Sequence, residues 1–315
     1  MQEAPKVSIC IPVYNRPDYI AEAIESVLNQ TFADFEIIVT DNCSTDNTPE
    51  VIKSYAARGK RVLYHKNKHN IGGLGNLNGA ILLARGEYIK PLFSDDKLAP
   101  QCLEIFVETM DKHPDVSLIT SFTQCIGDSD HIRGNTFFPG TGKLDGKTCQ
   151  KDLLLNGNWP GSPSSTMFRH KDLYIGLFNH ALTAYGDDLE MWIRLLGIGD
   201  AYVVPQILSY LRIHNQQASA TNNIDFAQIK DRLLLAKIAF CSPHMYGNYT
   251  KTEQKTLNNH LLERLVREGI GKKNLRCFLM MIKIGFSNLS YSRIKFCLIL
   301  LKNLRRFFKK TRFSK

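Results

Sequence analysis

The order of strand-like and helix-like segments over the first hundred residues limits the fold of this chain more than any other feature. Short, mostly apolar runs occur at residues 7–13, 35–39, 61–65 and 87–93. Helical spacing or a proline-led helix start marks residues 17–29, 49–58 and 72–84 between them. This alternation predicts an α/β fold with a doubly wound, mostly parallel sheet and helices on both faces. Because ligands bind such sheets outside the carboxyl ends of the strands, we expect the functional site there.

Polar residues follow three of the predicted strands. They are Tyr14, the pair Asp41 and Asn42, and the pair Asp95 and Asp96. Two adjacent carboxylates after a buried strand can hold a hard divalent cation against a diphosphate, although they also suit the cap of the next helix. The Asp41 carboxylate can accept the ring N–H of a pyrimidine, but its surroundings also suit a simple turn. Each motif taken alone leaves both interpretations open.

Two further clusters lie in the second half of the chain. A helix with one buried face is predicted by the spacing of Leu189, Trp192, Ile193 and Leu196. Asp187 and Asp188 come at its first turn, where Asp188 is either an acidic cap or a general base. The helix dipole is expected to keep Asp188 ionised at neutral pH. Arg212 and His214 share one face of a later strand, where a histidine is more often a satisfied polar group than a ligand.

Taken in order, these segments resemble the family 2 glycosyltransferases, which have a GT-A fold. The matching blocks are residues 7–15 (VSICIPVYN), 26–32 (SVLNQTF), 35–39 (FEIIV), 70–78 (NIGGLGNLN) and 84–88 (ARGEY). Each block is weak alone, but their joint occurrence in this order is specific. The resemblance covers roughly residues 7–215.

The resemblance implies roles for individual residues. The nucleotide site would comprise Pro12, Tyr14, Asp41, Asn42, Asn78 and Asp95. Asp41 would recognise uracil, and Asp95 would hold the ribose or the metal. Asp96 would bind Mg²⁺ or Mn²⁺ on the donor diphosphate, with His214 as a candidate further ligand. Asp188 would be the catalytic base, preceded by Asp187, and Arg212 would belong to a late block that closes over the diphosphate. As a departure, Phe93 stands where the first acid of an Asp-x-Asp motif is often found.

The excess positive charge lies at the end of the chain. The formal net charge is +10, yet residues 271–315 hold thirteen lysines and arginines and no acid, which leaves about −3 for residues 1–270. No apolar run there reaches the roughly 18 to 20 residues that span a bilayer. Basic residues interleaved with Phe and Leu favour contact with an anionic membrane over packing on the rest of the protein, and nucleic-acid binding ranks last.

These features predict two regions. We expect a GT-A catalytic domain over residues 1–222, with a nucleotide-binding half (1–100) and an acceptor half (101–222). A helical, basic region would follow over 223–315, with peripheral membrane contact through 272–315. The eight cysteines form no CxxC pair, and no secretion signal opens the chain, so we expect a cytoplasmic location on the inner face of the cell membrane.

The predicted function is that of a metal-dependent, inverting glycosyltransferase. It would move a sugar from a nucleotide sugar, with a preference for UDP, onto a hydroxyl of a glycan or lipid-linked glycan. A non-catalytic nucleotide-sugar-binding or scaffold protein is the alternative. A sugar-1-phosphate nucleotidyltransferase is disfavoured, because Pro12 to Asn15 stand where that class has a glycine-rich loop.

Overall fold

The chain divides into two units, Met1–Asn222 and Asn223–Lys315. The computed structural model describes residues 3–59, 61–127, 129–136, 138, 140–179 and 187–214 of the first unit, and residues 235, 250–257 and 260 of the second. The predicted membrane-contact segment, 272–315, lies outside the described residues. All predicted site residues lie in the described part of the first unit.

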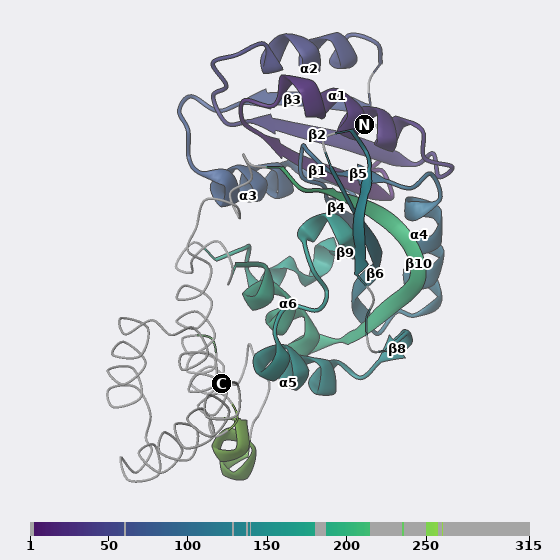
Figure 1. The fold of residues 1–315 in the computed structure, drawn as a ribbon, viewed down its shortest axis with the longest axis vertical. Helices are drawn as coiled ribbons and strands as arrows, with labels where there is room; N and C mark the ends of the chain where they lie inside the picture. The colour runs from purple at the N-terminus through teal and green to yellow at the C-terminus, as the bar shows by residue number, and fades with distance from the viewer. Residues whose placement is uncertain are drawn as a thin grey trace, which may run out of the picture. The chain divides into compact units, whose positions relative to one another are not determined.

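A single mixed sheet organises the first unit (Figure 1). Its strands are β1 (Val7–Val13), β2 (Phe35–Asp41), β3 (Val62–Lys66), β4 (Tyr88–Pro91), β5 (Lys97–Leu98), β6 (Val116–Ile126), β7 (Ile132–Thr136), β8 (Gly142–Leu144), β9 (Thr166–Arg169) and β10 (Asp200–Arg212). The order is β3-β2-β1-β4-β9-β6-β10-β5, with β7 beside β6 and β8 beside β10. β1, β2, β3, β4, β6 and β10 run in one direction, and the other described strands run antiparallel to their partners. The predicted mostly parallel sheet is confirmed.

Helices cover both faces of this sheet. They are α1 (Pro17–Leu28), α2 (Thr48–Ala56), α3 (Gly73–Leu83), α4 (Cys102–Lys112), α5 (Gly146–Asn156) and α6 (Asp187–Ile198), with short 3₁₀ turns η1 (Pro163–Ser165) and η2 (His170–Ile175). The odd-numbered apolar residues of β1 form one buried cluster with side chains of α1, α2 and α4. α3 contacts β1 and β2, and its buried apolar residues lie outside that cluster, so α3 covers the other face. Proline at the start of α1 and α2 suits the first turn of a helix.

Residues 127–161 are rich in glycine, aspartate, threonine and proline, which is typical of an irregular insertion, yet the segment contains β7, β8 and α5. All five residues of β7 are exposed and leave no apolar alternation to detect. β10 runs from Asp200 to Arg212, whereas the sequence alone indicates a strand only near residues 202–204. The register with β6 shifts between Val204 and Ile207, which accommodates Pro205 in a bulge where no ladder N–H is required.

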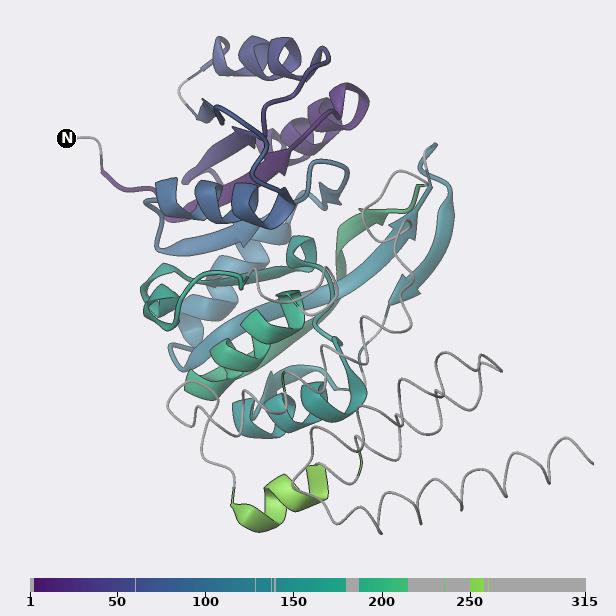
Figure 2. The same ribbon diagram turned by 90° about the vertical axis from the view of Figure 1, so that its left-hand side faces the viewer.

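α6 is fixed by one buried arginine. The Arg194 guanidinium pairs with Glu190 at 2.7 Å and donates to the carbonyl oxygens of Ile175, Gly176 and Leu177. Arg194 and Glu190 are almost fully buried, so the helix is covered on more sides than the predicted apolar face alone. Figures 1 and 2 both show α5 and α6 side by side. This packing holds the first turn of α6, where Asp187 and Asp188 lie.

Candidate active site

Strands that run in the same direction deliver the predicted residues to one edge of the sheet. Asp41 is the last residue of β2, and Tyr14 follows β1 directly. The Asp95–Asp96 pair comes a few residues after β4, while Arg212 ends β10. This edge carries the carboxyl ends of the co-directed strands, which is where the sequence predicted the site.

The end of β10 is joined to the acidic pair by three hydrogen bonds. Asp96 Oδ1 accepts the backbone N–H of Arg212 at 2.9 Å, and the Asp95 carbonyl accepts Arg212 Nε at 3.1 Å. The His214 Nε2 atom lies 3.0 Å from Asp95 Oδ2. Arg212 and His214 therefore meet the same loop, as their shared strand face predicted. His214 pairs with Asp95, whereas the prediction grouped it with Asp96.

The charges of this cluster fit a divalent cation. Asp96 is only 4% exposed, and burial together with the neighbouring Asp95 charge raises its pKa to about 8. The two carboxylates repel each other, a cost that a shared cation removes. In the described part of the chain no three acidic, histidine or cysteine side chains converge into a complete metal cage. Donor phosphates would have to complete the coordination, as is usual for Mg²⁺.

Arg212 has contacts that sequence reasoning missed. Its guanidinium reaches Glu22 of α1 at 2.7 Å and Asp130 at 3.1 Å, and it stacks over the Tyr19 ring at 5.0 Å. The side chain is 1% exposed and faces protein atoms. The Arg212 side chain thus holds α1, the acidic loop and the loop after β6 together, and the predicted closure over the diphosphate stays a prediction. Glu22 and Arg212 are 190 residues apart, so no local pattern could reveal the contact.

The predicted base-reading residues are already engaged within the protein. Asp41 is fully buried; its Oδ1 accepts the N–H of Ser44 at 2.8 Å, and its Oδ2 accepts the Tyr64 hydroxyl at 3.0 Å. Asn42 donates to Asn70 Oδ1 at 2.8 Å, and its own Oδ1 accepts the backbone N–H of Ile71. These bonds fix Asp41 and Asn42 at the carboxyl edge of the sheet, and recognition of a base by Asp41 stays a prediction.

Pro12, Tyr14 and Asn78 differ in their surroundings. Pro12 is buried in β1, whereas Tyr14 is 42% exposed at the carboxyl edge and is free to meet a ligand. The Asn78 amide donates to the Phe178 carbonyl at 2.9 Å and accepts the Phe178 N–H at 3.1 Å. Asn78 thus ties α3 to the segment after η2, and its predicted nucleotide contact has no support in this geometry.

The charge state of Asp188 differs from the prediction. Burial is the main cause that raises its pKa to about 8, and the charge of Asp187 adds to it. The helix dipole was expected to keep Asp188 ionised, but the loss of hydration on burial outweighs that effect. A carboxyl group with this pKa is poised to exchange a proton near neutral pH, which suits a general base.

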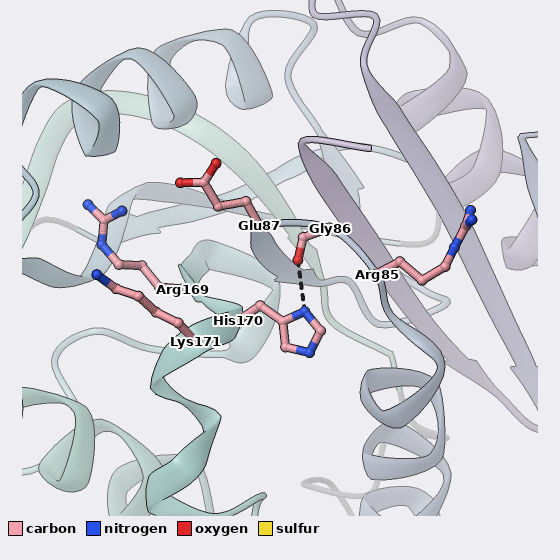
Figure 3. Close-up of a pocket in the computed structure, with 6 residues that line it drawn as sticks. All are labelled: Arg85, Gly86, Glu87, Arg169, His170 and Lys171. Atoms are coloured by element: carbon pink, nitrogen blue, oxygen red, sulfur yellow. Dashed lines mark hydrogen bonds between the residues drawn. The ribbon is translucent and has the colours of Figure 1, made fainter. Parts of the chain in front are cut away.

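A hollow of about 480 Å³ lies away from this cluster (Figure 3). Its lining residues either precede β4 or end and follow β9, so it opens at the amino edge of the parallel strands. His170 Nδ1 lies 2.9 Å from the Gly86 carbonyl oxygen, while Arg85 is directed away from Arg169 and Lys171. Arg85 pairs with Glu36, and Arg169 donates to backbone carbonyls. The hollow has no convergent groups for chemistry.

A mostly parallel sheet with acidic, arginine and histidine side chains at its carboxyl edge is the arrangement expected from the resemblance to nucleotide-sugar glycosyltransferases. Residues 8–178 match the model of glycosyl transferase family 2, and the chain belongs to that family. It is 38% identical over 132 residues to an uncharacterised glycosyltransferase of Methanocaldococcus jannaschii, which covers 41% of this chain and 46% of that protein. It is 30% identical over 192 residues to the GalNAc(5)-diNAcBac-PP-undecaprenol beta-1,3-glucosyltransferase of Campylobacter jejuni, covering 61% and 60%. The chain thus spans less than two thirds of the length of each of these two relatives.

Two solved structures share the fold. Residues 1–349 of S. aureus TarS in complex with UDP-GlcNAc superpose with a TM-score of 0.69 at 19% identity, covering 89% of this chain and 80% of that one. The mannosyltransferase PcManGT from Pyrobaculum calidifontis, in complex with GDP-Man and Mn²⁺, gives 0.58 at 14% identity, covering 99% and 83%. These likenesses confirm the predicted GT-A fold. Within the ranges that the structure describes, every helix is too short or too polar to cross a bilayer.

Proposed function

We propose that this protein transfers a sugar, with inversion, from a UDP-sugar to a hydroxyl of a glycan or lipid-linked glycan. The observation that carries the proposal is the convergence of Asp95, Asp96, Arg212 and His214 at the carboxyl edge of the sheet. These residues come from segments more than 100 residues apart, yet they form one hydrogen-bonded cluster. TarS and PcManGT, which share the fold, bind UDP-GlcNAc and GDP-Man respectively.

In the proposed reaction Asp188 takes the proton of the acceptor hydroxyl. The hydroxyl oxygen attacks the anomeric carbon opposite the leaving group, and the bond from that carbon to the diphosphate oxygen breaks with its electron pair on the diphosphate. Arg212 keeps the Asp95–Asp96 loop in place through its backbone and guanidinium bonds. Asp95 and Asp96 would hold Mg²⁺ or Mn²⁺ together with the donor diphosphate, and the cation would supply Lewis-acid stabilisation of the diphosphate charge.

Nucleotide titration tests the donor site directly. We expect calorimetry to show that UDP binds in the presence of Mn²⁺ and binds much more weakly in EDTA, because the paired carboxylates repel a diphosphate unless a cation lies between them. GDP and dTDP serve as matched controls for the base. Tighter binding of GDP would contradict the uridine preference, and no binding of any of the three would favour the scaffold alternative.

The lipid-linked acceptor and the membrane contact are part of the same proposal. The Campylobacter jejuni relative is named for an undecaprenol-linked substrate, and residues 271–315 carry thirteen basic residues without an acid. A segment of this composition is attracted to anionic lipid. If the protein acts on a polyprenol-linked glycan at the cytosolic surface of the membrane, a basic segment rich in aromatic residues after a near-neutral catalytic unit is what we would expect.

Liposome flotation measures the membrane contact. We expect the full chain to float with vesicles that contain phosphatidylglycerol and to stay at the bottom with neutral vesicles, since each basic residue near an anionic surface contributes about 1 kcal/mol. A variant with Arg305, Arg306, Lys309 and Lys310 changed to glutamine should float far less. Equal flotation of both proteins would contradict the electrostatic contact.

A further inference from the structure

A buried lysine lies directly behind the acidic loop and is unused by the mechanism above. Lys90 lies in β4, and its side chain is fully buried. Its ammonium group donates to the Ser164 carbonyl oxygen at 2.5 Å and to the Pro91 carbonyl oxygen at 3.1 Å. A lysine at a fully buried position destabilises the folded protein, because its charge loses hydration. Packing alone therefore does not explain why a lysine occupies this position.

Ser164 connects this lysine to the site. Its Oγ accepts the backbone N–H of Phe93 at 2.9 Å. Burial and the Asp95 charge raise the pKa of Asp96, and the Ser164 hydroxyl opposes them by favouring the charged form of the Asp96 carboxylate. The chain of contacts runs from Lys90 through Ser164 to Phe93, the first residue of the 93–96 loop. Burial lowers the pKa of Lys90 to about 8, and the charge of Asp96 is among those that oppose this effect.

We propose that Lys90 is a positioning residue for the cation site: by holding Ser164, it fixes the loop that presents Asp95 and Asp96 to a divalent cation and a nucleoside diphosphate. This inference rests on the proposed donor site. Lys90 does not contact the donor in this proposal. The site then includes Lys90 in β4 and Ser164 in the η1 turn, which lie 74 positions apart in the sequence.

Two effects of Lys90 on cation binding have opposite signs, and this makes the proposal testable. If the lysine acted only as a nearby positive charge, its removal would strengthen cation binding, because repulsion would be relieved. If it acts by positioning, its removal weakens cation binding, because Ser164 and the loop lose their fixed geometry. Loss of one hydrogen bond to a charged group corresponds to roughly tenfold in affinity.

Three single variants separate these cases. Lys90→Met keeps the length of the side chain and removes the charge and the donor. Ser164→Ala keeps the carbonyl that Lys90 binds and removes only the hydroxyl that accepts the backbone N–H of Phe93. Ser209→Ala is the matched control, because Ser209 Oγ donates to the same Ser164 carbonyl at 3.0 Å without a charge. Thermal melting of each variant establishes that it is folded.

The measurement is calorimetric titration of UDP at a series of Mn²⁺ concentrations with the full chain. We expect Lys90→Met and Ser164→Ala each to raise the Mn²⁺ concentration needed for half-maximal UDP binding about tenfold, and Ser209→Ala to change it less than about twofold. The double variant should lose little more than either single one, as expected for residues in one network.

Each other outcome overturns the proposal. If Lys90→Met leaves the Mn²⁺ concentration for half-maximal UDP binding unchanged or lowers it, Lys90 has only an electrostatic or a structural role. If Ser164→Ala leaves that concentration unchanged, Ser164 does not connect Lys90 to the loop. If Lys90→Met does not fold, Lys90→Gln, which retains a donor but not the charge, takes its place with the same expected direction. Absence of UDP binding in the unmodified protein would instead remove the proposed donor site, so the two failures are distinguishable.

Discussion

Replacing Asp188 with asparagine is expected to lower the rate of sugar transfer about 10²- to 10⁴-fold, the usual contribution of a positioned general base. Asparagine has nearly the same shape but cannot take a proton from the acceptor hydroxyl. UDP binding should stay within about twofold, because the donor cluster around Asp95 lies on other elements. Steady-state kinetics with a radiolabelled UDP-sugar and calorimetry with UDP measure the two effects. Near-normal turnover would remove Asp188 from the catalytic role.

The pH dependence of this reaction follows from the same residue. Because the pKa of Asp188 is raised to about 8 and a base works only after losing its proton, turnover should rise with pH up to about 8 and then level off. The unfolded chain releases this proton near its ordinary pKa of 3.8, whereas the native state keeps it until about 8. The Asp188 contribution to the free energy of unfolding therefore decreases as pH rises between these values.

Asp188→Asn removes this contribution to stability. The melting temperature of the variant relative to the unmodified protein should increase between pH 6 and pH 8.5, because only the unmodified protein has to bury a charge at the higher pH. A variant that is less active yet more stable at high pH is what a half-buried catalytic base with a raised pKa predicts. A temperature difference that does not change with pH would show that the surroundings of Asp188 do not raise its pKa in solution.

Replacing Asp96 with asparagine is expected to lower Mn²⁺-dependent transfer at least about 100-fold, because Lewis-acid stabilisation of a diphosphate amounts to several kcal/mol. Asparagine can still accept the Arg212 backbone N–H through its Oδ1, so the loop should keep its path. The variant should therefore fold, and UDP binding should become insensitive to Mn²⁺. Calorimetry with and without EDTA tests this.

Asp172→Asn is the matched control for Asp96→Asn. Asp172 is also a buried aspartate, and burial also raises its pKa, but it lies in η2 after β9. Its replacement should leave Mn²⁺-dependent UDP binding within about twofold of the unmodified protein. If both variants lost binding equally, the loss would reflect damage to the fold and not the removal of a cation ligand.

The sequence predicted the parallel half of the sheet better than the other half. Strands β1 to β4 and the helices between them can be predicted from their apolar runs and from the prolines at helix starts. β7 is exposed at every position, and β5 has two residues, so neither has a periodicity to find. β10 was predicted too short because Pro205 interrupts it, and only its partner β6 shows that the strand continues through a bulge.

The candidate site shows the same limit. Asp95, Asp96, Arg212 and His214 were predicted as site residues, and the structure gathers them. The role of each residue could not be predicted from the sequence, because it depends on contacts with residues far away in the chain. The raised pKa of Asp188 requires knowledge of its burial, which a helix-dipole argument does not contain. Lys90 and Ser164 gave no signal, since a lysine in a strand and a serine in a turn are ordinary residues until they are brought together.

β10 also limits how such an enzyme can be divided and recombined. This strand starts at Asp200 beside β8, in the half assigned to the acceptor, and ends at Arg212, which holds the loop of the donor half. A chimera that exchanges residues 101–222 for those of a relative would import the relative's own counterparts of Arg212 and His214, which contact the Asp95–Asp96 loop, along with any acceptor preference. Changes within loops would leave the contact between β10 and the Asp95–Asp96 loop intact, whereas exchanging residues 101–222 replaces one side of that contact.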